Sequence, residues 1–291
     1  MPVVALTSAH ASGVTVAALA MALSGPRPSL LAEADPKGGS VRTGYGMGQW
    51  GGEVGLWHLA QADREGALAE AFEAHLRRLD EGGSRLWLPG LTDPLQAAAL
   101  AQTWEPLGLL LQAMDQHAGY DVVVDAGRAV IEPGGVHPSL SPRPLLHRAD
   151  LVVLVVRTTL TSVAQSLPVA RALQGELEER GTGADALRLL LVQEGSVPAA
   201  EIHRRLQIPV VGTLPWEEKT ARLLTHGATT RQKPGSMALL KRAREAARAV
   251  GVDASTRRLR MQLPAPAVSS PVVASVVQRL TAPRQEVRLG G

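Results

Sequence analysis

Short apolar runs alternate with helix-like segments along most of this chain, and that alternation constrains the fold more than any other feature. Each run is rich in Val and Leu and is bounded by turn residues; the runs are residues 3–7, 30–32, 85–88, 121–125, 151–156, 187–192 and 210–214. Strands that alternate with helices form βαβ units, in which the strands are parallel and helices cover both faces of the sheet. The sequence therefore predicts an α/β fold with a doubly wound, mainly parallel sheet flanked by helices.

The segments that separate these runs have helical patterning. They are residues 14–23, 65–80, 93–117, 161–180, 198–206, 217–226 and 236–250. Asp93 is a predicted N-cap, because its carboxylate can accept hydrogen bonds from the free N–H groups of a first turn. From residue 253 the pattern fails and prolines punctuate the chain. We therefore predict one domain over residues 1–252, followed by a flexible Pro-rich tail over residues 253–291 with a short apolar helix around residues 272–280.

Composition narrows the class of protein. Hydrophobic residues make up 45% of the chain and charged residues 20%, which is typical of a globular protein. The absence of cysteine excludes disulfides and thiolate metal sites and favours the cytoplasm. No apolar run reaches the roughly 20 residues that span a bilayer, and the first residues lack the basic start of a signal peptide. We predict a cytoplasmic bacterial protein, for which a partner is the only route to peripheral membrane contact.

The first strand-to-helix connection, residues 7–15, is a candidate anion-binding loop. In an open parallel sheet, ligands bind at the carboxyl ends of the strands, and the N–H groups that begin the next helix attract anions. Gly13 leaves the backbone free to turn, and Thr15 offers a hydroxyl for Mg²⁺. An ordinary Ser/Gly turn is the competing interpretation of this segment taken alone.

Five segments, residues 9–15, 30–39, 119–127, 149–156 and 208–215, stand in the same order as five motifs of one family. The first (AHASGVT) corresponds to the loop K-G-G-x-x-K-[ST], the second (LLAEADPKGG) to L-L-V-D-x-D-P-Q-G, and the third (GYDVVVDAG) to the Walker B strand Y-D-x-V-x-x-D. The chain thereby resembles the MinD/ParA-type deviant P-loop ATPases over roughly residues 2–250. The resemblance implies a P-loop NTPase-like domain.

The resemblance also implies roles for individual residues. Thr15 and Asp125 would hold Mg²⁺, Asp35 would orient the attacking water as the catalytic residue, and ATP or ADP would bind with the metal. The residues implied to bind the nucleotide lie in the loop and in a base pocket: His10, Ala11, Ser12, Gly13, Val14, Thr15, Gln193, Pro215 and Trp216. Ala9 and Val14 replace the two lysines of the family's loop, so hydrolysis is expected to be weak or absent.

Each of these roles has a structural alternative. Asp35 would equally end its strand in an Asp-Pro turn, and Asp125 would equally cap the following loop. Trp216 would pack at a helix edge, and His10 would be an ordinary loop side chain. Gln193 stands where relatives often place an adenine-reading asparagine, and its extra methylene changes the geometry.

Basic residues gather in the C-terminal part of the chain. Between residues 219 and 261 there are eleven Lys and Arg against two Asp and Glu. Four of them fall on the polar face of the predicted helix 236–250: Lys241, Arg242, Arg244 and Arg248. Such a group binds DNA phosphates without sequence preference, as C-terminal helices of ParA relatives do, or forms a solvated helix face.

The resemblance implies a nucleotide-dependent positioning or assembly factor that acts in partitioning or localises a pilus or secretion machine, as the TadZ and CpaE subgroup does. Such a factor works as a homodimer together with a protein partner of the positioning or secretion system. Two alternatives stay open. The chain would be a pseudo-ATPase scaffold that binds protein partners without turnover, because the loop lysines are missing. It would otherwise be a nonspecific DNA-binding module that uses the basic C-terminal face.

Overall fold

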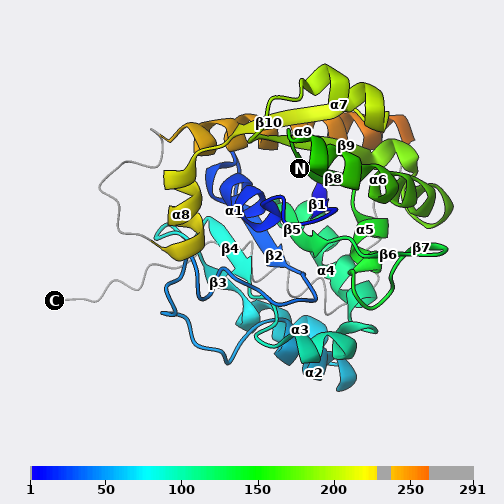
Figure 1. Cartoon of the computed structure of the whole chain (residues 1–291). Coiled ribbons are helices and arrows are strands. Elements are labelled where there is room, and N and C mark those ends of the chain that lie inside the picture. The colour runs from blue at the N-terminus through cyan, green and yellow to red at the C-terminus, as the bar shows by residue number, and fades with distance from the viewer. Residues whose placement is uncertain (1, 228–236, 262–291) are drawn as a thin grey trace.

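The computed structural model describes residues 2–227 and 237–261, which form a three-layer α/β structure around one large sheet (Figure 1). The sheet has the strand order β10-β9-β8-β1-β5-β2-β4-β3, and every neighbouring pair is parallel except β3 with β4. Its strands are β1 (Val3–Ser8), β2 (Ser29–Glu33), β3 (Arg77–Arg78), β4 (Arg85–Leu88), β5 (Asp121–Arg128), β8 (Leu151–Arg157), β9 (Leu187–Gln193) and β10 (Val210–Pro215). The predicted doubly wound parallel sheet is confirmed.

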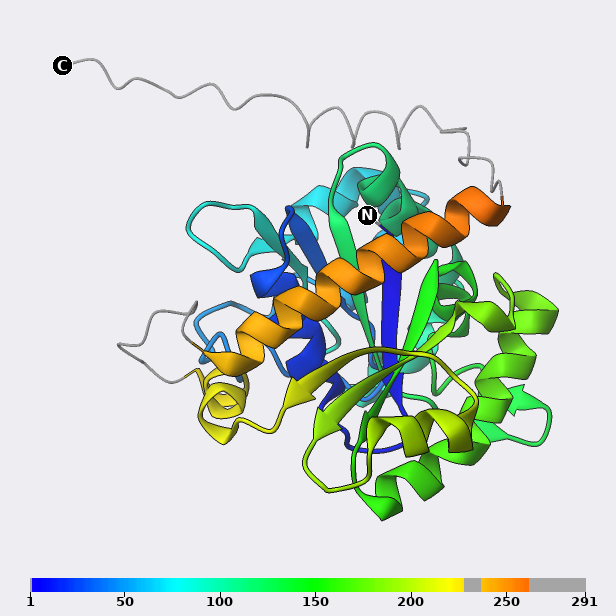
Figure 2. The ribbon, with the colours of Figure 1, turned by 90° about the horizontal axis from the view of Figure 1, so that it is seen from above.

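Helices cover both faces of this sheet. One face packs against α1 (Val14–Ser24), α8 (Glu218–His226) and α9 (Ala238–Met261), and α9 crosses the strands diagonally (Figure 2). The other face packs against α2 (Leu56–Arg64), α3 (Leu68–Phe72), α4 (Trp104–Gln116), α5 (Arg143–Arg148), α6 (Leu160–Arg180) and α7 (Ala199–Leu206). Shorter elements are the helices η1 (Glu73–His75), η2 (Pro94–Leu100) and η3 (Ala184–Ala186) and the hairpin β6 (Ile131–Glu132) with β7 (Gly135–Val136).

Alternating side chains of the central strands build the two cores. Val3 and Ala5 of β1 face the core under α4 to α7, whereas Val4 and Leu6 face the core under α1 and α9. Because both faces are covered, the strands are apolar throughout instead of alternating with polar residues. This explains why short Val- and Leu-rich runs in the sequence predicted the strands correctly.

The predicted helix over residues 65–80 is wrong. The chain there forms α3, η1 and then the edge strand β3, which pairs antiparallel with β4. Leu68, Phe72, Leu76 and Leu79 are all buried, as their helical spacing predicted. The pairing with β4 overrides that spacing after η1, because Leu79 N–H donates to the Arg85 carbonyl (2.8 Å) and so continues the β3–β4 hairpin.

Helix α9 continues to Met261 and therefore passes the domain boundary that we predicted at residue 252. Arg257 is buried and donates to the Asp185 carboxylate (2.7 Å), so the last turns of α9 are tied to the domain. Arg258 donates to the carboxylates of Asp115 on α4 and Asp150 at the start of β8. The predicted tail after residue 261 and its short helix lie outside the described residues.

The first turn of α9 is also held. The Glu217 carboxylate accepts a hydrogen bond from Leu239 N–H (2.7 Å), as a side chain does at a helix start. At another predicted helix start, Asp93 accepts from Leu95 N–H (2.9 Å), which confirms it as an N-cap. Within the described ranges no helix is long and apolar enough to cross a membrane.

Candidate functional site

The connection from β1 to α1 forms a tight loop at the carboxyl edge of the sheet. Gly13 has φ +86° and ψ 34°, a left-handed conformation that favours glycine, and α1 begins at the next residue. Ser12 N–H and the Ser8 hydroxyl both donate to the His10 carbonyl (2.5 Å each). The loop therefore turns sharply and directs the first N–H groups of α1 toward the edge where ligands of parallel sheets bind.

Thr15 and Asp125, the predicted metal ligands, are brought together behind this loop. Asp125 is 2% exposed, and its carboxylate accepts hydrogen bonds from the Thr15 hydroxyl and from Gly127 N–H (3.0 Å to the latter). Burial, reinforced by the nearby carboxylates of Glu33 and Asp35, raises the pKa of Asp125 to about 7. An ionised carboxylate is costly in such a place, and a cation or further donors would stabilise it.

Asp35 lies beside Asp125 at the same edge. Its carboxylate accepts from Lys37 N–H (2.8 Å) and packs so closely against Gly127 that a side chain at position 127 would overlap it. Burial raises the pKa of Asp35, while the charges of Lys37 and Arg128 oppose that shift. The Asp-Pro turn that we considered as an alternative is present, and it places the carboxylate in the candidate site as well.

Glu33 is a residue of this edge to which sequence reasoning gave no role. It is 1% exposed, and its two carboxylate oxygens accept four hydrogen bonds. The donors are Ser40 N–H (2.8 Å), Val41 N–H (2.9 Å), the Trp87 indole (2.9 Å) and Gly90 N–H (3.2 Å). Glu33 thus fastens the start of the long connection over residues 36–55 to β4. A carboxylate that ends an apolar strand was the signal in the sequence, because burying it requires partners.

A cavity of about 260 Å³ opens next to the loop. Ser12 and Gly13 line it on one side, and Pro215 and Trp216, at the end of β10, line it on another. Four of the nine residues predicted to bind the nucleotide thus line one space, two from the loop and two from the end of β10. The space is large enough for a small organic ligand. Trp216 is 51% exposed, so it is available to a ligand and is not buried in packing.

Gln193 does not line this cavity. Its side chain is exposed and lines a separate hollow together with Thr213 of β10 and Arg242 of α9. The register partner of Gln193 is Pro215, so the two lie side by side in the sheet although they face different spaces. Gln193 is therefore separated from Pro215 and Trp216, with which we predicted it to form a base pocket.

Arg157, the last residue of β8, lines the cavity and was missed by sequence reasoning. Its guanidinium carbon lies 5.1 Å from the ring centroid of Trp216, and its Nη1 donates to the Glu194 carboxylate (3.0 Å). An arginine that ends an apolar run at the carboxyl edge of the sheet was the available signal.

Three buried side-chain atoms around the loop and the cavity have no hydrogen-bond partner among residues 2–227 and 237–261. They are His10 Nδ1, Ser12 Oγ and Arg157 Nε. Buried polar atoms are nearly always paired in proteins, so three such atoms in one place mark a site that is built for a polar ligand. The N-terminus of α1, the Ser12 hydroxyl and the Arg157 guanidinium together favour an anion.

A magnesium nucleotide fits this donor set. The α1 N–H groups, Ser12 and Arg157 suit phosphate oxygens, while Thr15 and Asp125 suit Mg²⁺, which supplies further positive charge next to the phosphates when it is bound. In the part of the chain that the structure describes, no three His, Asp or Glu side chains are arranged to hold a metal ion by themselves.

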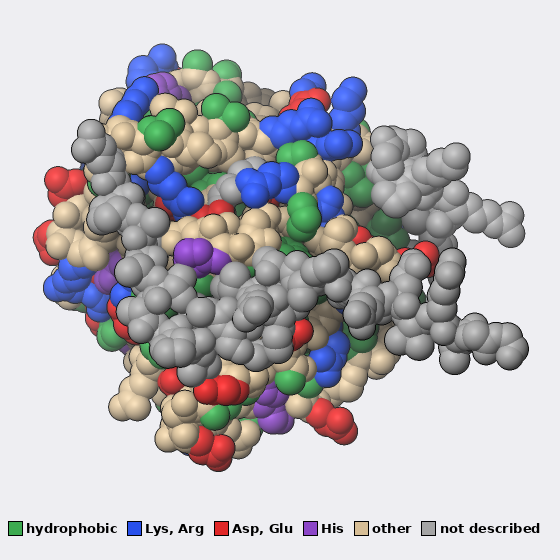
Figure 3. Space-filling model, turned by 180° about the vertical axis from the view of Figure 1, so that it is seen from behind, with side chains coloured by type: hydrophobic (Ala, Val, Ile, Leu, Met, Phe, Trp, Pro, Cys, Tyr) green, Lys and Arg blue, Asp and Glu red, His purple; other side chains and the backbone are tan. Residues whose placement is uncertain are grey.

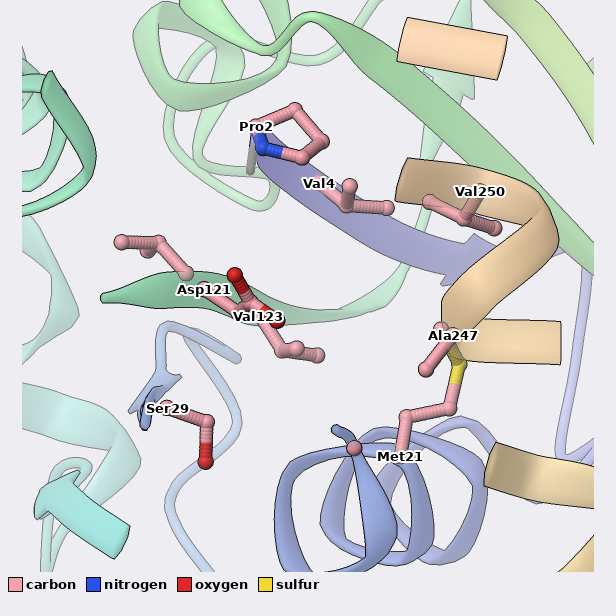
Figure 4. A pocket seen from close by; sticks show the side chains of 10 residues that line it. Pro2, Val4, Met21, Ser29, Asp121, Val123, Ala247 and Val250 are labelled. Atoms are coloured by element: carbon pink, nitrogen blue, oxygen red, sulfur yellow. The ribbon is translucent and has the colours of Figure 1, made fainter. Parts of the chain in front are cut away.

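A second cavity lies at the amino ends of the strands and is too small for such a ligand. Its volume is about 10 Å³, close to that of a single water molecule. Val4, Met21, Asp121 and Ala247 point toward it from β1, α1, β5 and α9 (Figure 4). This small cavity is therefore not a candidate site for such a ligand.

The predicted basic face is present on α9. Lys241, Arg242, Arg244 and Arg248 are all exposed, and Arg242 pairs with Glu245 (2.6 Å) on the same helix. Seen from behind, Lys and Arg side chains form several separate groups with other residue types between them (Figure 3). The structure thus confirms that these side chains are accessible, and DNA binding stays a prediction.

Fold and site together define a class of protein. The loop-bearing strand β1 lies between β5 and β8, α1 starts directly after the loop, and Thr15 meets Asp125 behind it. This is the arrangement of a P-loop NTPase-like α/β protein. No family model matches the sequence, and no curated protein matches it.

Solved structures narrow the class to the MinD/ParA-type fold. MinD from Aquifex aeolicus is similar with a TM-score of 0.61 at 17% identity, covering 87% of this chain and 97% of that chain. MinD complexed with Mg-ADP from Pyrococcus horikoshii OT3 gives 0.60 at 14%, with 88% and 98% covered. A ParA family ATPase from Chlorobium tepidum TLS gives 0.58 at 14%, with 84% and 97% covered. The chain has the fold of these ATPases, as its motifs predicted.

Proposed function

We propose that this protein is a cytoplasmic MinD/ParA-like positioning or assembly factor that binds ATP or ADP with Mg²⁺ and hydrolyses ATP weakly or not at all. The observation that carries the proposal is the convergence of three groups at one edge of the sheet. Thr15 and Asp125 form the metal side, and the Ser12 hydroxyl, buried without a partner among the described residues, lies at the phosphate side next to the cavity. Buried polar groups of this kind favour a bound ligand over a purely structural loop.

The proteins with the same fold support the kind of ligand and the kind of role. They include MinD with Mg-ADP and a complex of Cyanothece McdA with ATP. They also include a MinC:MinD cell division protein complex and a plasmid partition protein from Borrelia burgdorferi. We infer a homodimer that acts on a protein partner in partitioning, or in localising a pilus or secretion machine as the TadZ and CpaE subgroup does.

Weak hydrolysis follows from the residues at positions 9 and 14. Ala9 and Val14 carry no charge, whereas lysines in such loops stabilise the charge that develops during phosphoryl transfer. Asp35 and Asp125 retain the acidic side of the site. These residues are therefore compatible with nucleotide binding, and the missing lysines disfavour hydrolysis.

A pseudo-ATPase scaffold is the second candidate. The observation that favours it is the Glu33 anchor, which fixes the connection after Asp35 through four hydrogen bonds that involve no nucleotide. A segment held in this way would present one surface to a partner whether or not the cavity is occupied.

Isothermal titration of the full chain with ATP and with ADP, each with MgCl₂, separates the two candidates. The positioning factor binds both nucleotides, and Asp125→Ala weakens binding in the presence of Mg²⁺ while circular dichroism shows an unchanged fold. Phosphate release measured on the same samples stays close to background. No binding at millimolar nucleotide would overturn the proposed function and leave the scaffold.

A further inference from the structure

The backbone of Arg157 is fixed beside the phosphate loop. Strands β8 and β1 are parallel neighbours, and Leu154 is the register partner of Thr7. Arg157 follows Leu154 by three residues, so it stands level with the loop that follows Thr7, because both strands rise by about 3.3 Å per residue. Arg157 N–H donates to the Ser162 hydroxyl (3.0 Å), which holds the end of β8 against the start of α6.

The side chain of Arg157 keeps donors for a further acceptor. Trp216 stacks on its guanidinium, and Glu194 accepts only from Nη1 (3.0 and 3.2 Å). Its Nε is buried and has no partner among residues 2–227 and 237–261. The Trp216 ring and the Glu194 carboxylate therefore hold the guanidinium in position next to the cavity, which Ser12 also lines.

We propose that Arg157 binds the phosphates of the nucleotide and supplies the positive charge of the loop lysine that Val14 replaces. The inference rests on the proposed function, since it requires a phosphate-bearing ligand in this cavity. Guanidinium donors form paired, charge-assisted hydrogen bonds with phosphate oxygens. Contacts with the Trp216 ring and the Glu194 carboxylate already restrict this side chain, which reduces the entropy lost on binding.

Other cations near the loop are less suited to this role. Arg222 also lines the cavity, but its side chain is 70% exposed and pairs with Glu218 (2.7 Å) on the same helix. Lys37 and Arg128 act on the carboxylate of Asp35, on the metal side of the site, and neither lines the cavity. Within the described ranges, Arg157 is the cation that combines a place in the cavity, a fixed backbone and a free donor.

The test compares variants of the full chain by isothermal titration with ATP and MgCl₂. Arg157→Met keeps an unbranched, flexible side chain and removes the charged guanidinium, and we expect its affinity for ATP to fall by roughly tenfold or more. Arg157→Lys should lose less, because it keeps the charge. Adding Val14→Lys to Arg157→Met should recover affinity, because a loop lysine then supplies the charge. Arg171→Met, at an exposed position on α6 that does not line the cavity, is the matched control and should stay within about twofold of the unmodified protein.

The outcomes separate this assignment from the proposed function. If the unmodified protein binds no nucleotide, both are overturned. If it binds ATP and Arg157→Met binds equally well, the role of Arg157 is overturned and the proposed function stands. Arg157→Met could also lose affinity while Arg157→Lys is equally weak and the added Val14→Lys restores nothing. In that case Arg157 acts by packing against Trp216, and the phosphate assignment is again overturned. Thermal melting of each variant verifies that it is folded.

Discussion

Glu33 of β2 and Asp125 of β5 are register partners on adjacent parallel strands, so two buried carboxylates stand side by side at the carboxyl edge of the sheet. They use their oxygens differently. Glu33 accepts four hydrogen bonds from the protein, whereas Asp125 interacts with Thr15 and Gly127 and faces the candidate metal site. The Glu33 carboxylate therefore stabilises the structure at this edge, whereas the Asp125 carboxylate is available to a ligand.

Replacing Glu33 with Gln should lower the free energy of unfolding by about 2 kcal/mol and loosen residues 36–55. An amide group would direct its own N–H atoms at two of the four donors that Glu33 accepts. Urea denaturation measures the stability, and hydrogen exchange at Ser40 and Val41 measures the loosening. Glu53→Gln, an exposed change in the same segment, should alter neither quantity. Unchanged exchange at Ser40 and Val41 in Glu33→Gln would contradict the anchor.

Restoring a lysine with Val14→Lys should raise the affinity for ATP about tenfold, because a cation at the start of α1 would contact the β- and γ-phosphates. Titration calorimetry with ATP and MgCl₂ checks this. Val16→Lys, further along α1 and at the cavity wall, is a control for charge placed elsewhere. An affinity in Val14→Lys that is unchanged or weaker would show that the loop does not have the geometry of a phosphate loop.

Glu176 should make stability depend on acid pH. Arg143 (2.7 Å), His147 (2.7 Å) and Val136 N–H bond to its buried carboxylate, and these donors outweigh desolvation and hold its pKa below the usual value of 4.5. The unfolded chain therefore takes up the proton at a higher pH than the folded chain. The stabilisation is complete above pH about 4.5 and is lost as pH falls below that value through the folded pKa.

Glu176→Gln should consequently be less stable than the unmodified protein at pH 7, by about 2 kcal/mol, and the two should converge as the pH falls below 4.5. Urea unfolding at several pH values measures the difference. Glu179→Gln, an exposed neighbour on α6, serves as the control and should run parallel to the unmodified protein. A constant gap between Glu176→Gln and the unmodified protein across this pH range would refute the linkage.

A quadruple variant should lose any salt-sensitive binding of duplex DNA when Gln replaces Lys241, Arg242, Arg244 and Arg248. The salt dependence arises because contacts between basic side chains and phosphates release counterions from the DNA. Fluorescence anisotropy with a labelled duplex at increasing salt measures the slope. Arg204 and Arg205, exposed on α7, give a control pair of equal chemistry at another place. If the quadruple variant still binds with the same salt dependence, the binding face lies elsewhere.

The sequence predicted the sheet well because its signals are local. Each central strand is an uninterrupted Val- and Leu-rich run, and Asp93 with its adjacent proline indicates a helix start. The failures involve partners far apart in the chain. Pairing with β4 converts the end of the predicted helix 65–80 into β3, and ion pairs of Arg257 and Arg258 with distant aspartates extend α9 past residue 252.

The same distinction applies to the site. The order of the motifs predicted five site residues that the structure places at one edge of the sheet: Ser12, Gly13, Thr15, Asp35 and Asp125. The role of Glu33 depends on donors from two separate segments, residues 40–41 and 87–90. That of Arg157 depends on Trp216, 59 positions later in the chain. Each side chain ends an apolar run in the sequence, but its partners are distant in the chain, so sequence reasoning did not assign it a role.

Helix α9 is fastened at both ends: Glu217, which lines the cavity, accepts from Leu239 N–H in its first turns, and Asp115 and Asp150 hold Arg258 near its last. Its 24 residues span about 36 Å at 1.5 Å per residue. The helix is therefore a rigid rod that joins the wall of the cavity to the opposite edge of the sheet. The four basic side chains project from that rod, so their spacing is fixed before any partner arrives.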